Sequence, residues 1–272
     1  MTPVPYGVVV NYLKKYLLNN PSWGIILGSG WNIITSSPCA GENRDFTVEH
    51  KIPYQQLSYF PIPTIPGHEG ELIIGKLGKI PLIILSGRTH LYEGYSPEEI
   101  VSPIRILARF GIKKLIITNA AGAINPDFQV GEIMLITDQI NFQFKSLGQL
   151  NSLKPCNPFD TALLKLTEGI GKKLHLKLRK GIYLGVNGPS YETAAEIKMF
   201  GKIGADAVGM STVIETMTAM RYGMKVLGIS CLVNKATGLS RIQLEHQRVL
   251  KVIEKVKNQL NTLIKNVVLS SE

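Results

Sequence analysis

The chain has 272 residues, of which 44% are hydrophobic and 18% are charged. This composition is typical of a globular protein with a sizeable core, and it excludes disordered and fibrous proteins. The formal net charge of +10 would suit an acidic partner such as nucleic acid, an anionic membrane surface or a phosphate-bearing substrate. Six basic residues and one acidic residue fall between positions 165 and 180, so half of the excess is local. We therefore expect no nucleic-acid partner.

The cysteines and the N-terminal residues bear on the compartment. Cys39, Cys156 and Cys231 lie far apart and form no Cys-x-x-Cys pair, which favours a reducing compartment, and we expect the cytoplasm. The first residues place their charges after a short apolar run and contain no small-residue cleavage site, unlike a secretory signal. No apolar run approaches the roughly 18 residues of a membrane helix, so we expect no membrane partner.

Short apolar runs predict the strands of a sheet. Continuous runs of Ile, Leu and Val are typical of strands that are covered on both faces. These runs lie at residues 24–27, 72–74, 82–85, 115–118, 133–136 and 226–229.

Capping signals predict helices between these strands. Ser96 and Glu99 have the spacing of a capping box around a proline, which predicts a helix that runs to Phe110. Thr193 and Glu196 repeat this signature. Three glycines stand where helix C-caps are expected, namely Gly111, Gly201 and Gly223.

An amphipathic helix is expected to close the chain, starting at about Leu244. Its apolar residues recur at spacings of four and three, which places them on one face of a long helix. These residues are Val249, Ile253, Val256, Leu260, Leu263 and Val267.

The alternation of strands and helices, without a linker or a change of composition, predicts one α/β domain over residues 1–272. We expect a central mixed, mostly parallel β-sheet that is covered by helices on both faces. Residues 53–70 and 142–158 are rich in proline or in polar residues, and they predict long loops near a site.

The first predicted strand ends in a segment that suits an anion. The glycines of Leu27-Gly-Ser-Gly30 let the backbone approach a ligand closely, although an ordinary strand-to-helix turn is the alternative. A dinucleotide fingerprint would need a glycine at Ile33, and a P-loop would need Gly-Lys-Ser/Thr, so both of these nucleotide sites are excluded.

Two further strand ends carry similar chemistry. Arg88 and His90 stand at i and i+2 of an extended segment, so they project to the same side and suit a phosphate clamp. The alternative is a surface loop with an Arg88–Glu93 pair. Residues 118–122 add an amide and small residues with accessible N–H groups. Because open α/β sheets bind ligands at the carboxyl ends of their strands, we expect the three segments to meet at one site.

Polar residues of the second half suit the edge of a heterocycle. Asn234 can both donate and accept hydrogen bonds, and Lys235 is expected to be a solvated charge. Glu192 can either serve the helix N-terminus that Thr193 caps or accept hydrogen bonds from a ligand. His246 falls on the apolar face of the last helix, where the pattern alone favours a core residue. The histidines show no metal-ligand spacing and no Gly-x-Ser-x-Gly segment is present, so we expect neither a metal nor a serine nucleophile.

Seven segments, in the same order, resemble the homotrimeric type of the purine nucleoside phosphorylase family. They are residues 27–30, 66–70, 87–95, 118–122, 188–193, 208–212 and 234–235. The resemblance implies a nucleoside phosphorylase-like fold and the phosphorolysis of purine nucleosides, namely inosine, guanosine and their 2′-deoxy forms. Inorganic phosphate would be the co-substrate, with no cofactor, and ribose 1-phosphate would form with inversion through an oxocarbenium-like state. A homotrimer is also implied.

The resemblance assigns roles to individual residues. Phosphate would be held by Ser29, His68, Arg88, His90, Asn119, Ala120 and Ser211. The nucleoside would be contacted by Tyr92, Tyr191, Glu192, Val208, Met210, Asn234 and His246. The residues implied in catalysis are His90, Glu192, Asn234 and His246. Glu192 would accept the N1–H of a 6-oxopurine, and Asn234 would stabilise negative charge on the leaving base.

The chain also departs from the family pattern. The family usually has Phe where this chain has Tyr191, and Thr or Ser where it has Val233. The stretch 142–161 is shorter and lacks the aromatic block that lends a Phe to the neighbouring subunit. Phe144 and Phe159 are the candidates for that role.

Two alternative functions stay open at this point. A methylthioadenosine phosphorylase would favour Asp in place of Asn234, so the amide argues against it. A nucleoside-binding protein without turnover is the other alternative, and the altered stretch 142–161 motivates it.

Overall fold

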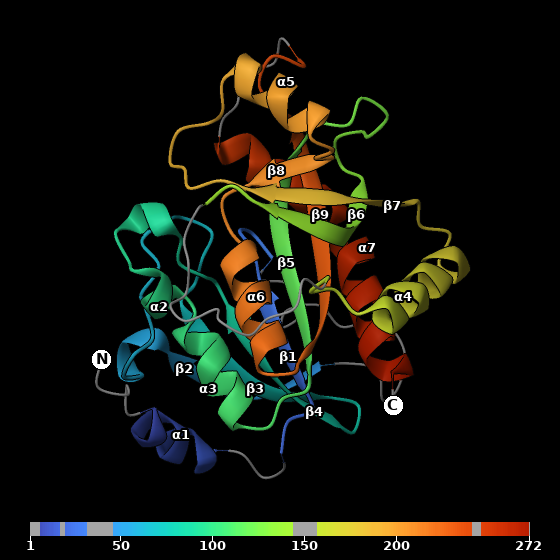
Figure 1. Cartoon of the computed structure of the whole chain (residues 1–272). Helices are drawn as coiled ribbons and strands as arrows, with labels where there is room; N and C mark the ends of the chain where they lie inside the picture. The colour runs from blue at the N-terminus through green and yellow to red at the C-terminus, as the bar shows by residue number, and fades with distance from the viewer. Residues whose placement is uncertain (1–5, 17–19, 32–45, 144–156, 241–245, 272) are drawn as a thin grey trace.

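A nine-stranded sheet runs through the protein, whose computed structural model describes residues 6–16, 20–31, 46–143, 157–240 and 246–271 (Figure 1). The strands are β1 (Trp23–Leu27), β2 (Phe46–Pro53), β3 (Glu71–Leu77), β4 (Ile80–Ser86), β5 (Lys114–Ala123), β6 (Ile133–Asn141), β7 (Leu178–Gly185), β8 (Ala207–Gly209) and β9 (Lys225–Lys235). Every strand expected from an apolar run is present. Five of the strand pairings are parallel and four are antiparallel, so the expected mixed sheet is confirmed.

The second half of the sheet closes on itself. The strand order is β2-β3-β4-β1-β5-β8-β7-β6-β9, and β9 pairs again with β5. The strands β5, β8, β7, β6 and β9 therefore form a closed ring. Strands β4, β1, β5 and β9 are mutually parallel, so their carboxyl ends lie at the same edge of the sheet.

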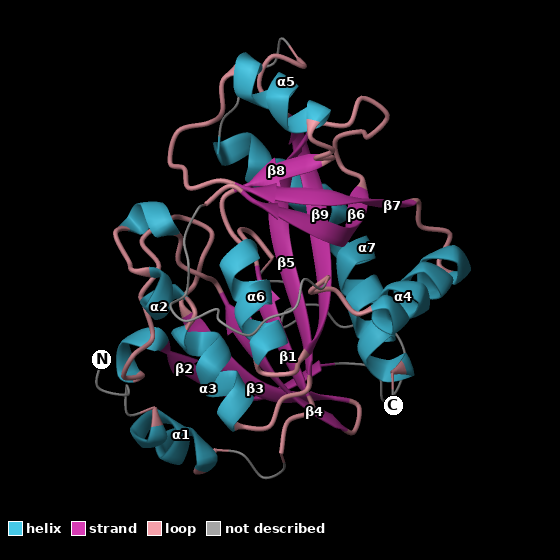
Figure 2. Ribbon diagram, in the orientation of Figure 1, coloured by secondary structure: helices cyan, strands magenta, loops and turns pink. Residues whose placement is uncertain are grey.

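Two pairs of helices lie beside the sheet (Figure 2). Helix α3 (Ser102–Arg109) packs with α6 (Val213–Arg221), and α4 (Thr161–Lys173) packs with α7 (His246–Ser270). Helices α4, α6 and α7 all contact β9. The remaining helices are α1 (Gly7–Lys14), α2 (Pro97–Ile100) and α5 (Ala194–Lys202), with short 3-10 turns η1 (Tyr54–Gln56) and η2 (Leu91–Glu93).

Both predicted capping boxes are present, but the first helix is shorter than expected. Ser96 and Glu99 cap α2, and Thr193 and Glu196 cap α5, each with reciprocal side-chain bonds. The run to Phe110 is divided into α2 and α3. Pro103 explains the division, because a proline in a helix offers no N–H to the carbonyl four residues earlier. The Ser102 hydroxyl donates to the Glu99 carbonyl at 2.8 Å instead.

Several local predictions need correction. Gly111 and Gly223 adopt the positive φ of C-caps, whereas Gly201 lies inside α5 and Gly204, at φ +94°, ends that helix. Strands β2, β7 and β8 were not expected, because the first two contain charged residues and the third has only three residues. The basic stretch 165–180 therefore continues past the end of α4 into β7.

The last helix follows the apolar pattern. All six residues predicted to form its apolar face are buried, from Val249 at 8% exposure to Val267 at 0%.

No helix in the described ranges is both long enough and apolar enough to cross a lipid bilayer.

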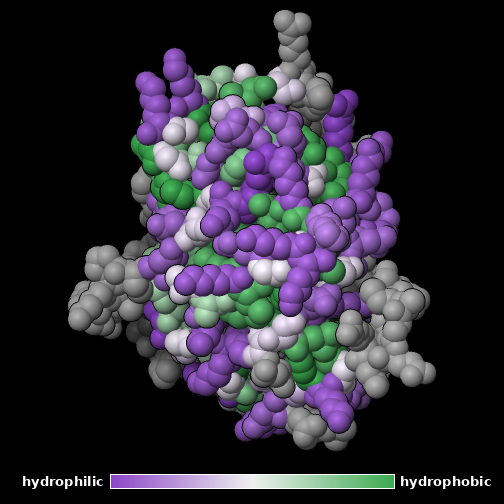
Figure 3. Space-filling model, turned by 90° about the vertical axis from the view of Figure 1, so that its right-hand side faces the viewer, coloured by the Kyte–Doolittle hydropathy of each residue, from purple (hydrophilic) through white to green (hydrophobic). Residues whose placement is uncertain are grey.

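Part of the basic excess is neutralised locally. The face on the right of Figure 1, turned to the viewer in Figure 3, is covered mostly by hydrophilic side chains. Arg179 and Lys177 both pair with Glu132, at 2.7 and 2.9 Å, and Lys180 pairs with Glu168 at 3.3 Å. These contacts make half of the basic residues in 165–180 members of ion pairs.

Replacing Gly228 by alanine is expected to destabilise the fold. Its place in β9 leaves room for the Phe159 ring, and an added Cβ would stand 2.6 Å from that ring. We expect the free energy of unfolding to fall by about 1–3 kcal/mol, the usual penalty of an overpacked core. The matched control is Gly169→Ala in α4, where nothing lies within 4 Å of an added Cβ. It should stabilise the protein by about 0.5–1 kcal/mol. Chemical denaturation measures both, and equal effects would contradict this packing.

Candidate active site

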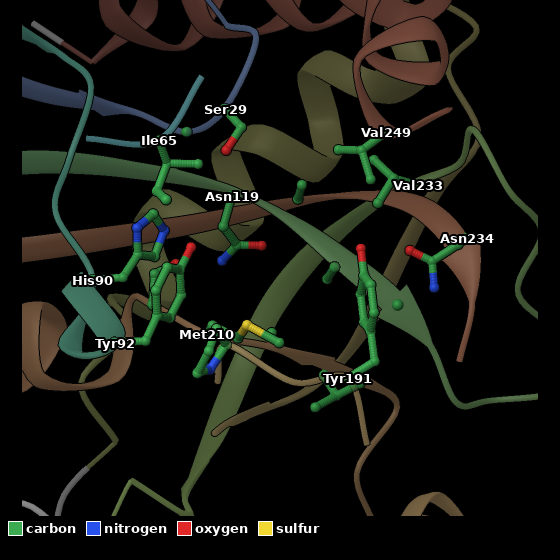
Figure 4. A pocket seen from close by; sticks show the side chains of 18 of the residues that line it. Ser29, Ile65, His90, Tyr92, Asn119, Tyr191, Met210, Val233, Asn234 and Val249 are labelled. Carbon is green, nitrogen blue, oxygen red and sulfur yellow. The ribbon is translucent and has the colours of Figure 1, made fainter. Parts of the chain in front are cut away.

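A pocket of about 350 Å³ lies where the parallel strands end (Figure 4). Its lining comes from segments that follow β1 and β4, from the last part of β5 and β9, and from β8 with the two residues after it. The loops at 65–68 and 189–192 and one residue of α7 complete it. The three strand ends that were predicted to bind an anion therefore meet in this pocket. Of the residues that the family resemblance implied, those on the pocket are Ser29, His68, Arg88, His90, Tyr92, Asn119, Ala120, Tyr191, Glu192, Val208, Met210, Ser211 and Asn234. His246 begins α7, and its side chain lies outside the described part of the protein.

A buried arginine forms one end of the pocket. Arg88 is 5% exposed, and its Nη1 donates to Ser211 Oγ at 2.9 Å and to Thr212 Oγ1 at 3.3 Å. Its Nη2 has no hydrogen-bond partner among the described residues, and neither has Asn119 Oδ1. Because a buried donor without a partner is unfavourable, the unused N–H groups of Arg88 suit an anion in the pocket.

The alternative Arg88–Glu93 pair is wrong. Arg88 Nε lies 3.5 Å from Glu215 Oε1, whereas Glu93 pairs with His90. His90 Nδ1 is 2.9 Å from Glu93 Oε1, which also accepts from the His90 backbone N–H at 2.7 Å. The Nδ1 proton therefore points to the carboxylate and leaves Nε2 to meet a ligand. The His90 ring also stacks on Tyr92, with ring centroids 4.8 Å apart, so its orientation is fixed on two sides.

His68 and Ser29 form a second pair at the same end. The Arg88 backbone N–H donates to His68 Nδ1 at 3.2 Å, so that nitrogen is an acceptor. The ring proton is then on Nε2, which lies 2.9 Å from Ser29 Oγ and donates to it. This arrangement leaves the hydrogen of the Ser29 hydroxyl to point into the pocket.

The turn that carries Ser211 is strained. Thr212 has φ +76° and ψ −47°, and the Val213 N–H donates to the Ser211 carbonyl at 2.8 Å. These values describe a γ-turn of the rare kind, in which a β-branched residue is especially unfavourable. Backbone strain of this sort persists where surrounding contacts enforce it, commonly at ligand sites.

The other end of the pocket carries groups suited to a base. A β-bulge in β9 places Asn234, rather than Val233, opposite Gly122 of β5. Consecutive strand residues normally face opposite sides, but at a bulge both can turn the same way, and both Val233 and Asn234 line the pocket. Asn234 Nδ2 donates to the Lys235 carbonyl at 2.8 Å, which leaves its second N–H and its Oδ1 for a ligand.

Glu192 faces the pocket rather than the helix that follows it. The N-terminus of α5 is capped by Thr193 and Glu196, so Glu192 is not needed there. Burial raises the pKa of its carboxyl group, and the nearby Glu196 acts in the same direction. Lys235, expected to be a solvated charge, instead donates to the Pro126 and Phe128 carbonyls and holds that loop against β9.

Phe159 is not available to a neighbouring subunit. It is 3% exposed and lies in the core beside Val226 of β9. Phe144, the other candidate, falls outside the described residues. Of the two candidates, Phe159 is thus ruled out as the residue that completes a partner's pocket.

Sequence reasoning missed the residues behind the pocket. Thr212 and Glu215 have the Thr-x-x-Glu spacing of a third capping box, a signal that could have found them. Ile65, Pro189 and Val249 also line the pocket, and no local pattern indicates this.

The pH dependence of stability should reveal the Glu93 contacts. Burial alone would raise its pKa, but hydrogen bonds from His90 and Thr64 outweigh it and lower the pKa from 4.5 to about 2. A lowered pKa contributes stability above the ordinary value, and this contribution is lost as the pH falls through the folded value. Glu93→Gln should therefore lower Tm at neutral pH, and the difference from the native protein should narrow between pH 4.5 and 2.

Thermal unfolding from pH 2 to neutral measures this difference. Glu132, whose pKa is also lowered to about 2, is unchanged in both proteins, so its effect cancels. A difference in Tm that is constant over the whole range would contradict the assignment.

Comparison with known proteins agrees with this arrangement. The family model of the phosphorylase superfamily matches residues 32–269. Purine nucleoside phosphorylase 1 of Bacillus subtilis (strain 168) is 39% identical over 275 aligned residues, which cover 96% of each chain. The purine nucleoside phosphorylase of Bos taurus is 31% identical, with 95% of this chain and 92% of that one covered.

Solved structures agree as well. The Schistosoma mansoni purine nucleoside phosphorylase in complex with adenosine has a TM-score of 0.83 at 28% identity, over 98% of this chain and 97% of that one. Isoform 2 from the same organism, in complex with cytosine and ribose-1-phosphate, has a TM-score of 0.84 at 32% identity, over 98% and 96%. By sequence and by fold, the chain belongs to the purine nucleoside phosphorylase family within the phosphorylase superfamily.

Proposed function

We propose that this protein catalyses the phosphorolysis of 6-oxopurine nucleosides, namely inosine, guanosine and their 2′-deoxy forms. Inorganic phosphate is the co-substrate, and no cofactor takes part. The main support for this proposal is that the two ends of the pocket carry different chemical groups. One end holds the buried guanidinium of Arg88 with unused donors, and the other end holds the amide of Asn234 and the carboxyl group of Glu192. A ligand with an anion at one end and a polar heterocycle at the other fits this arrangement.

Phosphate binds at the Arg88 end. We expect it to meet Arg88 Nη2, which has no hydrogen-bond partner among the described residues, together with the Ser29 hydroxyl and His90 Nε2. The sugar lies between the two ends, against Tyr92, which is beside His90, and Met210, which lies between Tyr92 and Tyr191 in Figure 4. This order places a phosphate oxygen on the face of the sugar opposite to the base.

The reaction exchanges one bond to the anomeric carbon for another. The C1′–N9 bond breaks with an oxocarbenium-like transition state, and a phosphate oxygen forms the new bond from the opposite face. Ribose 1-phosphate therefore forms with inversion, and the base leaves with the electron pair of the broken bond and takes up a proton. Phosphate is already an anionic nucleophile, so no general base is required.

The leaving base is stabilised by Asn234 and Glu192. The free N–H of Asn234 Nδ2 donates to the base as negative charge develops there. Preorganised donors of this kind are typically worth about 2.7–4 kcal/mol each in the transition state. The carboxylate of Glu192 accepts N1–H, which a 6-oxopurine has and adenine lacks. Selectivity for 6-oxopurines follows from these two contacts.

Initial rates on inosine, guanosine, adenosine and methylthioadenosine, with and without phosphate, test the proposal. We expect ribose 1-phosphate from inosine and guanosine only when phosphate is present. No product from inosine, at concentrations that bind it, would identify a binding protein without turnover. Preference for methylthioadenosine would identify the alternative phosphorylase.

Asn234→Asp is expected to slow turnover of inosine and to favour 6-aminopurines. A carboxylate cannot donate to N7 unless it is protonated, but it can accept from an exocyclic amine. We expect the ratio of the inosine to the adenosine rate to fall by about tenfold, the effect of one lost hydrogen bond to a developing charge. Asn258→Asp, at an exposed position of α7, is the matched control and should leave the ratio unchanged. An unchanged ratio in Asn234→Asp would contradict the base contact.

We also propose a cytoplasmic homotrimer. The family resemblance supports the trimer, and the dispersed cysteines support the reducing compartment. Light scattering after size-exclusion chromatography measures the assembly, and a monomeric mass would contradict it.

A further inference from the structure

Glu215 is the only buried Asp or Glu among the described residues. It lies directly behind the phosphate end of the pocket. It is 4% exposed and occupies the third position of α6. It does not line the pocket itself. Instead it borders a separate cavity of about 20 Å³ together with Tyr54, Thr89 and Arg88. Glu215 therefore cannot contact a ligand, although the residues it touches can.

Its two carboxylate oxygens contact two different parts of the phosphate end. Oε1 lies 3.5 Å from Nε of Arg88. Oε2 accepts the backbone N–H of Thr212 at 2.7 Å. The first contact is an ion pair without a hydrogen bond, which attracts the guanidinium to the side of Glu215. The second holds the strained turn whose preceding residue, Ser211, carries a hydroxyl to the pocket. One buried side chain thus contacts both Arg88 and the turn that carries Ser211, two parts of the phosphate end that come from opposite halves of the sequence.

The charge of Glu215 acts against the affinity of the site for an anion. A carboxylate beside Arg88 offsets part of the positive charge that phosphate would meet, and in a buried environment this effect is stronger than in water. For phosphate binding, this loss of attraction is offset only if the orientation of the guanidinium contributes more. A guanidinium binds a phosphate through a planar fork of N–H groups, so its direction determines whether two bonds or one can form.

We propose that Glu215 is a positioning residue for phosphate, which it serves by orienting Arg88 and the Ser211 turn. The proposal rests on the proposed function, because it takes phosphate as the anion in the pocket. It differs from a purely structural role, in which Glu215 would only cap α6.

Two substitutions separate these roles. Glu215→Ala removes both contacts, and we expect the Kd for inorganic phosphate to rise by about tenfold or more, as for the loss of one charged hydrogen bond. Glu215→Gln keeps an oxygen for the Thr212 N–H, so the Kd should rise less than in the alanine variant. The KM for nucleoside should change little in either variant, because the base end is not involved.

Glu99→Gln is the matched control. Glu99 occupies the same position in the capping box of α2, but it is exposed and away from the pocket. It should leave the Kd for phosphate unchanged. If Glu215→Ala does not fold, the Kd for phosphate of Glu215→Gln is compared with that of Glu99→Gln, and a higher Kd in Glu215→Gln supports the proposal.

Isothermal titration with inorganic phosphate gives the Kd without turnover, and thermal unfolding gives the stability of each variant. A raised Kd in a folded Glu215 variant supports the proposal, even if the native protein binds phosphate without turning over inosine. An unchanged Kd with a lowered Tm would show a helix cap only and overturn it. A native protein that binds no phosphate would overturn both this proposal and the proposed function.

Discussion

The buried charge of Arg88 is the constraint on which the rest of the site depends. A guanidinium that is 5% exposed needs compensation, because an isolated charge is far less stable in a protein interior than in water. The protein compensates it in part: Glu215 lies beside Nε and two hydroxyls accept from Nη1, but neither Nε nor Nη2 has a hydrogen-bond partner among the described residues. An anion in the pocket completes this set. The burial that makes an uncompensated guanidinium unfavourable therefore favours an anion beside Arg88.

The sheet brings these groups together over long distances in sequence. The hydrogen bond between Arg88 and Ser211 joins residues 123 positions apart, and it forms because β4 and β8 are connected through β1 and β5. Close approach of the strands is required as well. A Cβ on Gly28 would stand 3.0 Å from backbone atoms of residues 118 and 119, so a side chain there would push the end of β1 away from β5 and widen the phosphate end.

The sequence predicts those parts of the fold and site whose signals are local. Strands such as β4 and β5 are continuous apolar runs, and the boxes at Ser96 and Thr193 need only residues three positions apart. The charged strand β7 has no such signal, since its burial depends on its neighbours. The same limit applies to the site. Arg88 was visible in its motif, but the only acidic partner considered for it was the nearby Glu93, as an alternative to the phosphate clamp, because the contact with Glu215 exists only in three dimensions.

The residue at the strained turn illustrates how competing terms are balanced. Glycine at position 212 would avoid the backbone strain of the γ-turn, which is about 1–3 kcal/mol for other residues. Glycine would also remove the hydroxyl of Thr212, which accepts from Arg88 Nη1 and from Asn119 Nδ2 at 2.8 Å. Each buried donor left without a partner costs about 1–3 kcal/mol. Two lost partners outweigh one relaxed dihedral angle, so threonine is favoured even though the backbone there suits glycine. The strain is a consequence of satisfying the groups that surround the anion.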